Sequence, residues 1–192
     1  IPHWQGFLEG YDRLTLSNMS VHHLDALRFL LGDPEEVTTL TRPDPRTQFE
    51  HSDGIVVSTL RFPSGAVAVS LEDVWSGPRA EGYEDDQHIN WRVEGTDGVA
   101  KGTIGWPTGA PSTLSYASQK STNGEWVTPE WETMWFPHAF IGVMEQLQYA
   151  VKTGTAPALS VADNVRTMAL VEAAYKSIEE RRTVRLSEIE ID

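Results

Sequence analysis

Two histidines, an amide and a carboxylate stand together at the start of a predicted helix, in the stretch NMSVHHLD at residues 18–25. At about 100° per residue, Asn18, His22 and Asp25 fall within roughly 60° of one another on the helix surface. An imidazole exchanges a proton near neutral pH, and a carboxylate one turn away can hold its tautomer. The pair His22 and Asp25 could therefore act as acid or base towards a hydroxyl group, which the amide of Asn18 could orient but not deprotonate.

The same residues have simpler explanations, which spacing alone leaves open. A histidine and an aspartate on the polar face of an amphipathic helix are usually just solvated. His23 lies nearer the apolar side, where a packed histidine is the expected role. A metal site made of His22, His23 and Asp25 is disfavoured, because adjacent histidines on a helix point about 100° apart and cannot readily share one ion.

A further histidine, His138, precedes a second predicted helix in the stretch WFPHAFIGVM. It could cap that helix or face a substrate cleft. The seven tryptophans of the chain could line a sugar-binding cleft, but a sheet face that packs on a partner is the favoured explanation. The sequence contains no G-x-S-x-G elbow, no zinc-like spacing, no Walker loop and no G-x-G-x-x-G fingerprint.

The apolar pattern predicts one helix near the start of the chain and two near its end. The first covers residues 14–31 and stops at Gly32, and the second runs from near Ala139 to Gly154. The third begins after Ser160, which can pair with Asp163 in a capping arrangement. Its expected apolar stripe consists of Val161, Val165, Met168, Val171 and Ile178.

Between the helices the period changes to that of strands. Residues 36–40, 54–62, 66–75 and 88–95 are short runs rich in β-branched and aromatic side chains. Turn residues at 63–65 and 97–98 predict two antiparallel hairpins, and Asn123–Gly124 predicts a third, with Trp126 in its returning strand. The order predicts an α+β fold with an open, mostly antiparallel β-sheet and helices packed on one face.

The composition excludes several classes of protein. The formal net charge is −13, which repels nucleic acid and anionic membrane surfaces. The sequence has no cysteine and no apolar run approaching the roughly 20 residues that span a bilayer. We therefore expect no nucleic-acid and no membrane partner, and a cytoplasmic location. Because the chain begins with Ile1 rather than methionine, we also expect it to be an excised segment that forms a single domain, residues 1–192.

Several stretches together resemble one known family. They are NMSVHHLD with LRFLLGDPEEV, the hairpin RFPSGAVAVSLED, the turn RVEGTDGVAKG, and the segment from HAFIGVMEQL to RRTVRL. In this order they are similar to the C-terminal domain of the Gfo/Idh/MocA oxidoreductases, which include glucose–fructose oxidoreductase and inositol dehydrogenase. The resemblance covers nearly the whole chain.

The resemblance implies a dihydrodipicolinate reductase-like sheet domain that binds substrate and forms oligomers. Family members bind NAD or NADP mainly through an N-terminal Rossmann domain with a catalytic lysine in an E-K-P stretch, and neither that fingerprint nor E-K-P occurs here. The family's open sheet face often packs on another subunit. The resemblance therefore implies a homodimer or homotetramer, with a cofactor held outside this chain.

The family's active-site helix commonly reads D-x-x-x-H-x-x-D, which places His22 at the histidine and Asp25 at the second acid. By resemblance, His22 and Asn18 are the catalytic candidates and Asp25 is a candidate for substrate binding. His138, from its place before the second helix, is the other candidate for substrate binding. Asn18 replaces the usual aspartate, so it keeps the hydrogen-bonding shape but removes a charge. Either the mechanism shifts towards His22 and Asp25, or the activity or the substrate differs from that of a typical member.

The leading hypothesis is the substrate-binding half of an NAD(P)-dependent oxidoreductase. It would transfer hydride between a nicotinamide and a sugar, inositol or related polyol, although this chain by itself should be inactive. The alternative is a non-catalytic relative, a sugar- or cofactor-responsive binding or assembly module that retains the fold. A structural protein that dimerises through its sheet is a third possibility.

Overall fold

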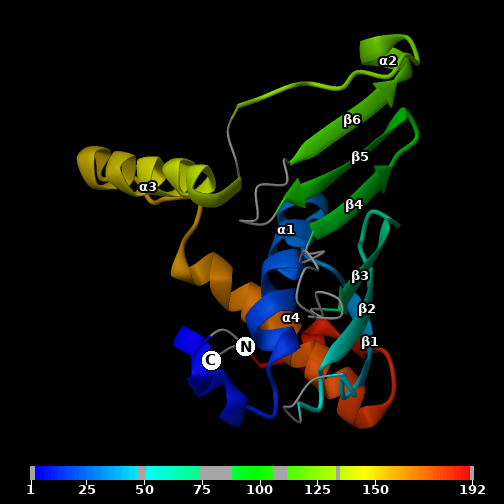
Figure 1. Ribbon diagram of the computed structural model, residues 1–192, viewed down its shortest axis with the longest axis vertical. Coiled ribbons are helices and arrows are strands. Elements are labelled where there is room, and N and C mark those ends of the chain that lie inside the picture. The colour runs from blue at the N-terminus through cyan, green and yellow to red at the C-terminus, as the bar shows by residue number, and fades with distance from the viewer. Residues whose placement is uncertain (1–2, 47–50, 74–87, 106–111, 133–134, 191–192) are drawn as a thin grey trace, which may run out of the picture. The chain divides into compact units, whose positions relative to one another are not determined.

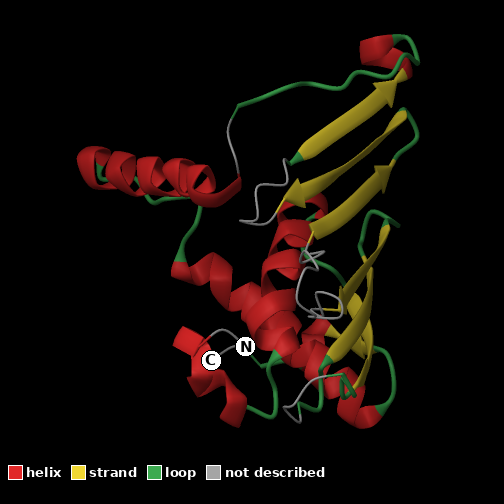
Figure 2. Ribbon diagram, in the orientation of Figure 1, coloured by secondary structure: helices red, strands yellow, loops and turns green. Residues whose placement is uncertain are grey.

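The computed structural model describes residues 3–46, 51–73, 88–105, 112–132 and 135–190. Its internal contacts divide the chain into two compact units, one made of residues 1–75 and 158–192 and the other of residues 76–157. Figure 1 labels the elements along the chain, and Figure 2 separates the helices from the strands. Each unit is described by itself.

The first unit is built on a four-stranded antiparallel sheet in the order β3-β2-β1-β7. Its strands are β1 (Glu36–Arg42), β2 (Ile55–Arg61), β3 (Val67–Asp73) and β7 (Val184–Arg185). Its long helices are α1 (Val21–Leu31) and α4 (Val161–Glu180). Short helical turns are η1 (His3–Gly10), η2 (Leu16–Ser20) and η3 (Leu186–Glu188).

The hairpin between β2 and β3 forms where the turn residues predict it. Gly65 adopts a φ of 85°, a left-handed conformation that glycine reaches without steric cost. The N–H of Phe62 donates to the carbonyl of Ala66 and closes the turn. This fixes the register that pairs Leu60 with Ala68, and Leu60 then lies on the buried side of the sheet.

The core lies between this sheet and the two helices. Val37, Val56 and Leu60 on the sheet are fully buried, as are Leu24 of α1 and Leu170 of α4. Helix α4 packs against both β1 and α1. The first unit therefore has two layers, with α1 and α4 covering one face of its sheet.

Helix α4 buries a different set of residues from the one we predicted. Val161 is 82% exposed and Met168 is 40% exposed, so the predicted stripe is wrong at both positions. Because α4 contacts β1, β7, η3 and α1, its buried surface is wide and needs small side chains for close approach. The residues that fill it include Thr167, Ala169, Leu170, Val171, Ala173, Ala174 and Ser177.

The second unit contains a three-stranded antiparallel sheet in the order β4-β5-β6. Its strands are β4 (His88–Glu94), β5 (Gly98–Gly105) and β6 (Thr113–Ser118), and its helices are α2 (Gln119–Thr122) and α3 (Trp135–Thr153). The β4–β5 hairpin turns just before Gly98, as predicted. Helix α3 starts two residues before Pro137, which the first turn of a helix tolerates, and is followed by Gly154 with a φ of 70°.

The third predicted hairpin is only partly correct. After β6 the chain forms the single turn α2, reverses through Asn123 and Gly124, and returns to β6 at one bridge, Tyr116 to Val127. Trp126 therefore lies beside this bridge and not in a strand. Ser118 caps α2 by accepting a hydrogen bond from the N–H of Ser121, which explains why a helical turn replaces the tight turn.

The predicted order of one helix, a run of strands and two helices is confirmed, and so is the α+β class with antiparallel pairing. The strands that the structure describes form two sheets, of four and three strands. Within the same residues, no helix combines the length and the low polarity that a membrane crossing requires.

Candidate functional site

A buried carboxylate fixes the start of the helix that carries the predicted site. Asp53 is 1% exposed and accepts hydrogen bonds from the backbone N–H groups of Leu14 and Leu16 at 2.8 and 2.9 Å. The hydroxyl group of Tyr175 on α4 donates to the same carboxylate at 3.0 Å. N–H groups at a helix start lack partners within the helix, so Asp53 stabilises this end and ties it to α4.

The first part of this helix is a π-turn and not an α-helix. In η2 the N–H of Val21 donates to the carbonyl of Leu16, five residues earlier. This inserts an extra residue into the turn, so the spacing from Asn18 to His22 departs from the regular 100° per residue. Asn18 lies inside the π-turn, whereas His22 and Asp25 lie in α1. Such turns occur frequently at functional sites, because they re-aim the side chains that they carry.

The three predicted residues of this helix lie away from its buried side. His22 is exposed, Asn18 and Asp25 are half-buried, and Leu24 is fully buried. Among the residues that the structure describes, no side-chain hydrogen bond joins Asn18, His22 and Asp25 to one another. The structure therefore leaves the imidazole of His22 and the amide of Asn18 open to a ligand.

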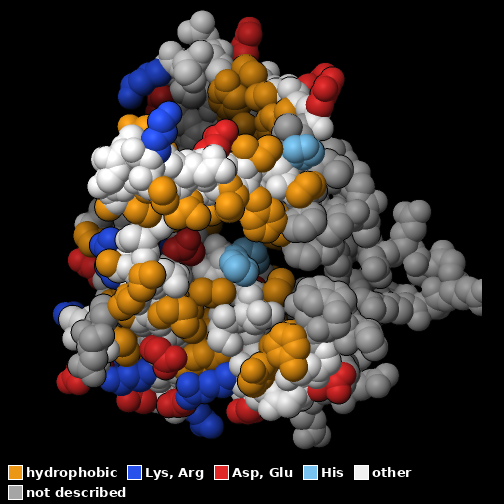
Figure 3. Space-filling view, turned by 90° about the vertical axis from the view of Figure 1, so that its left-hand side faces the viewer, with side chains coloured by type: hydrophobic (Ala, Val, Ile, Leu, Met, Phe, Trp, Pro, Cys, Tyr) orange, Lys and Arg blue, Asp and Glu red, His pale blue; other side chains and the backbone are white. Residues whose placement is uncertain are grey.

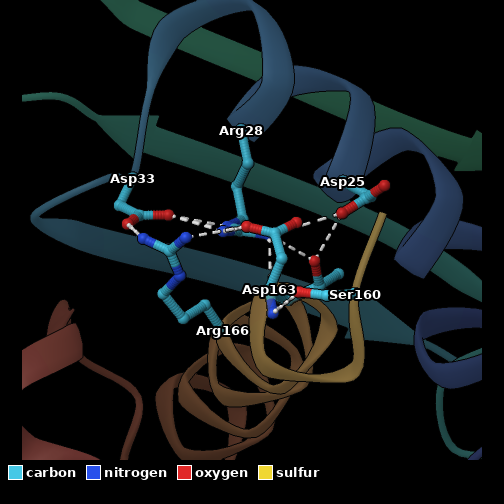
Figure 4. Close-up of polar contacts among 7 residues, drawn as sticks. Asp25, Arg28, Asp33, Ser160, Asp163 and Arg166 are labelled. Carbon is cyan, nitrogen blue, oxygen red and sulfur yellow. Dashed lines mark hydrogen bonds and ion pairs between the residues drawn. The ribbon is translucent and has the colours of Figure 1, made fainter. Parts of the chain in front are cut away.

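Asp25 is held by one of its two oxygens. Thr167 of α4 donates to Oδ1 at 2.5 Å, and Nη1 of Arg28 donates to the same oxygen at 3.3 Å. The other oxygen points away from these partners in Figure 4. The carboxylate is therefore oriented by the protein while half of its hydrogen-bonding capacity remains available.

Arg28 is the centre of a polar network that joins α1 to α4. Its side chain is only 5% exposed, and it contacts Asp33 at 2.8 Å and Asp163 at 3.2 Å. Arg166 bridges the same two aspartates at 2.8 Å each, as Figure 4 shows. Burial alone would lower the pKa of Arg28, but the hydrogen bonds to Asp33 and Asp163 raise it above its ordinary value. Arg28 therefore stays charged and fixes the helix that carries Asp25.

The same network gives the first unit an expected dependence on acid. The hydrogen bond from Arg28 holds the pKa of Asp163 below its ordinary value of about 3.9. A lowered pKa in the folded state stabilises the protein above the unfolded value, and this contribution is lost as the pH falls through the folded value. We expect the free energy of unfolding to fall from about pH 5 towards pH 2, and to fall less steeply in Asp163→Asn.

Urea unfolding at a series of pH values measures this slope. Asp12→Asn is the control, because Asp12 is exposed and lies outside the network. Equal slopes for Asp163→Asn and Asp12→Asn would show that Asp163 does not contribute to the acid sensitivity.

A second polar contact, which the sequence did not reveal, joins α1 to the sheet. Nδ1 of His23 lies 3.0 Å from Oε1 of Glu72 on β3, and the hydroxyl group of Ser70 donates to the same oxygen. The Glu72 side chain is 1% exposed and that of His23 is 29% exposed. His23 therefore lies on the side of α1 that faces the sheet, where it is the hydrogen-bonding partner of a buried carboxylate. The sequence signal for this contact is the alternation of side chains along β3, which places Ser70 and Glu72 on the same face of the strand.

A shallow hollow lies next to Asp25. Its volume is about 290 Å³, and it is lined by Asp25, Leu159, Ser160, Val161, Asp163 and Asn164. The lining therefore mixes carboxylate, hydroxyl and amide groups with two apolar side chains. Such a mixture suits a small molecule that carries hydroxyl groups on a carbon frame.

His138 lies in the first turns of α3 in the second unit, where its side chain is exposed. Its predicted role in substrate binding stays a prediction. In the part of the chain that the structure describes, no three acidic or histidine side chains are grouped so that they could hold a metal ion.

The model of a protein family described as "Oxidoreductase family, C-terminal alpha/beta domain" matches residues 10–186. This match spans most of the chain and both compact units. The chain belongs to the Gfo/Idh/MocA oxidoreductase family. The sequence resemblance is thereby confirmed.

Individual members of the Gfo/Idh/MocA family share the sequence or the fold of this chain. The D-apiose dehydrogenase of Rhizobium rhizogenes is 28% identical over 187 residues, which cover 94% of this chain and 51% of that protein. An oxidoreductase from Agrobacterium radiobacter, solved with NAD+, L-tartaric acid and magnesium, superposes with a TM-score of 0.75 at 22% identity and covers 97% of this chain and 53% of its own. A levoglucosan dehydrogenase, solved with NADH and levoglucosan, superposes with a TM-score of 0.68 at 17% identity. The match covers 90% of this chain and 50% of that protein.

This chain therefore has the fold of the C-terminal α/β domain of the Gfo/Idh/MocA family. The chain spans about half the length of the relatives that it matches.

Proposed function

We propose that this chain is the substrate-binding half of an NAD(P)-dependent oxidoreductase that transfers hydride between a nicotinamide and a sugar, inositol or related polyol. The observation that carries the proposal is the exposed His22 on a helix fixed at both ends, next to Asp25 with one oxygen held and the other available. The named relatives support a sugar or polyol as the substrate class, since they include dehydrogenases of D-apiose and levoglucosan.

The residues of this chain would supply binding and proton exchange. Asn18 would orient a substrate hydroxyl group by hydrogen bonding, and His22 would accept its proton during oxidation or return it during reduction. Asp25 would bind a neighbouring hydroxyl group through its available oxygen. His138 would add a further hydrogen bond to the substrate.

The described residues do not fit the phosphates of a dinucleotide. The start of α4 lines the hollow beside Asp25, and there the N–H of Asp163 already donates to Ser160. The carboxylates of Asp25 and Asp163 line the same hollow and would repel a pyrophosphate. We therefore infer that NAD or NADP is bound mainly by a Rossmann domain outside this chain, and that this chain alone is inactive.

Absorbance at 340 nm tests the proposal on the full-length protein. Sugars, inositols and their acids are screened with NAD and with NADP. We expect turnover with at least one neutral polyol. No turnover with any of them, in a protein that binds nicotinamide cofactor, would contradict the proposal.

One observation favours a second candidate function. Asn18 occupies the position of the family's usual aspartate, so a charge that could assist proton transfer is missing. A non-catalytic module that binds a sugar or cofactor could tolerate this change. The same screen separates the two functions, because the module would bind a polyol or nicotinamide without any change in absorbance.

We also propose that the outer face of the four-stranded sheet binds a second copy of the chain, as a homodimer or within a homotetramer. On this face Leu40 pairs with Val57 and Val57 pairs with Leu71, which forms an apolar row across three strands. Leu40 is 70% exposed, and Leu71 and Val69 are each 64% exposed. A contiguous apolar surface of this kind is typical of protein interfaces.

Leu71→Lys tests this surface by placing a charge at the β3 end of the apolar row. We expect the variant to be a monomer under conditions where the wild-type protein is a dimer or tetramer, because an unpaired charge in an interface is costly. Size-exclusion chromatography with light scattering measures the mass. Phe29→Lys is the control, since Phe29 is 84% exposed on α1 and lies away from the sheet face. A monomeric wild-type protein at high concentration would contradict the proposal.

A further inference from the structure

The contact between His23 and Glu72 has the chemistry of an oriented imidazole. Nδ1 of His23 lies 3.0 Å from Oε1 of Glu72, and because a carboxylate accepts hydrogen bonds, this pairing favours the tautomer of His23 with its proton on Nδ1. In a neutral ring the other nitrogen, Nε2, is then the acceptor. No described residue donates to Nε2. Glu72 thus selects the tautomer in which the open nitrogen of His23 is the accepting one.

The burial of the Glu72 carboxylate costs more folding free energy than a purely structural role requires. Its other oxygen, Oε2, is buried and has no hydrogen-bond partner among the described residues. Ser20, one turn before His23, is also buried, and its hydroxyl group likewise lacks a described partner. Burying a carboxylate without full pairing costs folding free energy, and an apolar residue could fill the space at lower cost.

The imidazole is the accessible part of the pair. The side chain of His23 is 29% exposed, whereas that of Glu72 is 1% exposed. His23 follows His22 directly, so both rings belong to the same turn of α1. A hydroxyl group that reaches the exposed part of this ring would meet an imidazole whose orientation is already fixed by Glu72.

We propose that His23 is a second hydroxyl-binding residue and that Glu72 is its positioning residue, fixing the tautomer in which Nε2 accepts a hydrogen bond from the substrate. This inference rests on the proposed function for the identity of the ligand, a neutral polyol. It assigns a task to a buried carboxylate that the proposed roles of Asn18, His22 and Asp25 do not use.

Nuclear magnetic resonance of the 192-residue chain tests the tautomer without any cofactor. Long-range proton–nitrogen spectra of the histidine rings identify which nitrogen carries the proton. We expect His23 to be protonated at Nδ1 in the wild-type chain. In Glu72→Gln we expect a shift towards the Nε2–H tautomer, because the amide of glutamine can also donate to Nδ1. An Nε2–H tautomer of His23 in the wild-type chain overturns the inference.

Steady-state kinetics of the full-length protein test the role in binding, with D-glucose and myo-inositol as the first probes. We expect Glu72→Gln and His23→Phe each to lower kcat/KM by about 10- to 100-fold, mainly through KM. Glu94→Gln, an exposed carboxylate on β4, is the matched control and should leave both constants unchanged.

The outcomes separate this inference from the proposed function. Normal kcat/KM in Glu72→Gln, together with a loss of turnover in His22→Ala, overturns the role of Glu72 and leaves the oxidoreductase proposal in place. If the wild-type protein turns over no polyol, the proposed function fails. The NMR experiment, which compares the tautomer of His23 in the wild-type chain and in Glu72→Gln, then decides by itself whether Glu72 positions His23. A loss of kcat/KM that coincides with an unfolded Glu72→Gln chain also overturns the inference, because it shows a structural role.

Discussion

His22→Ala is expected to lower kcat/KM for the preferred polyol by about 10²- to 10⁴-fold, with the loss mainly in kcat. General acid–base catalysis by a positioned imidazole contributes a factor of this size, and alanine can neither accept nor return the hydroxyl proton. The fold should be retained, because His22 is exposed and no described residue forms a hydrogen bond with its side chain. The measurement is the initial rate at 340 nm over a range of substrate concentrations, which separates kcat from KM.

Leu30→Ala is the matched control for His22→Ala. Leu30 lies on the same helix and is 62% exposed, so its truncation tests whether any change on this surface disturbs the enzyme. We expect Leu30→Ala to keep wild-type kinetics. A His22→Ala variant with near-normal kcat would contradict the assignment of His22 as the acid–base residue. A group other than His22 would then exchange the proton of the substrate hydroxyl group.

Much of the fold could be predicted because its local signals agree with one another. The turn residues at 63–65 lie between two β-branched runs, and Ser160 precedes a long helix that it caps. The helix near the start of the chain was predictable from Leu24, Leu27 and Leu31, which pack in the core or against it. Such elements follow from periodicity and capping, which act over a few residues.

The orientation of β3 shows where local pattern fails. Val67, Val69 and Leu71 are its most apolar residues and would be assigned to the core by pattern, yet they are 63–64% exposed. The buried positions are Ser70 and Glu72, with Ala68 partly buried. Pairing of β3 with β2 fixes which face is inward, and this information lies outside the strand itself. The same long-range pairing brings Glu72 to His23, so the contact could not be found from spacing along the helix.

The candidate site was predictable in its residues but not in its geometry. The motif singled out Asn18, His22 and Asp25, but it gave no sign of the π-turn that separates Asn18 from His22. Nor could it show that Asp25 shares a network with Thr167, which follows it by 142 residues. These features depend on tertiary contacts, which a motif in one helix does not encode.

Arg28→Ala is expected to destabilise the first unit by about 3 kcal/mol. The side chain of Arg28 is 5% exposed, and it faces carboxylates of Asp25, Asp33 and Asp163. Removing the guanidinium leaves these charges close together and opens a cavity between α1 and α4. The three carboxylates are 34–45% exposed, so water offsets part of the lost interaction energy. The expected loss therefore lies near the lower end of the range for breaking a buried ion pair. Urea unfolding gives the free energy, and amide hydrogen exchange in α1 and α4 assigns it to this unit.

Arg166→Ala is the control for Arg28→Ala, because Arg166 binds the same Asp33 and Asp163 but is 53% exposed. An exposed ion pair contributes little, so we expect a loss below about 1 kcal/mol. Equal losses in the two variants would show that burial of Arg28 adds nothing to the network.

Arg28→Lys then separates stability from function. Lysine keeps the charge but cannot reach Asp25, Asp33 and Asp163 at once, because it lacks the planar fork of the guanidinium. If the network positions Asp25 for substrate, this variant should raise KM in the full-length protein while kcat, which depends on His22, changes little. An unchanged KM would mean that Thr167 alone holds Asp25, and that Arg28 contributes to folding without reaching the site.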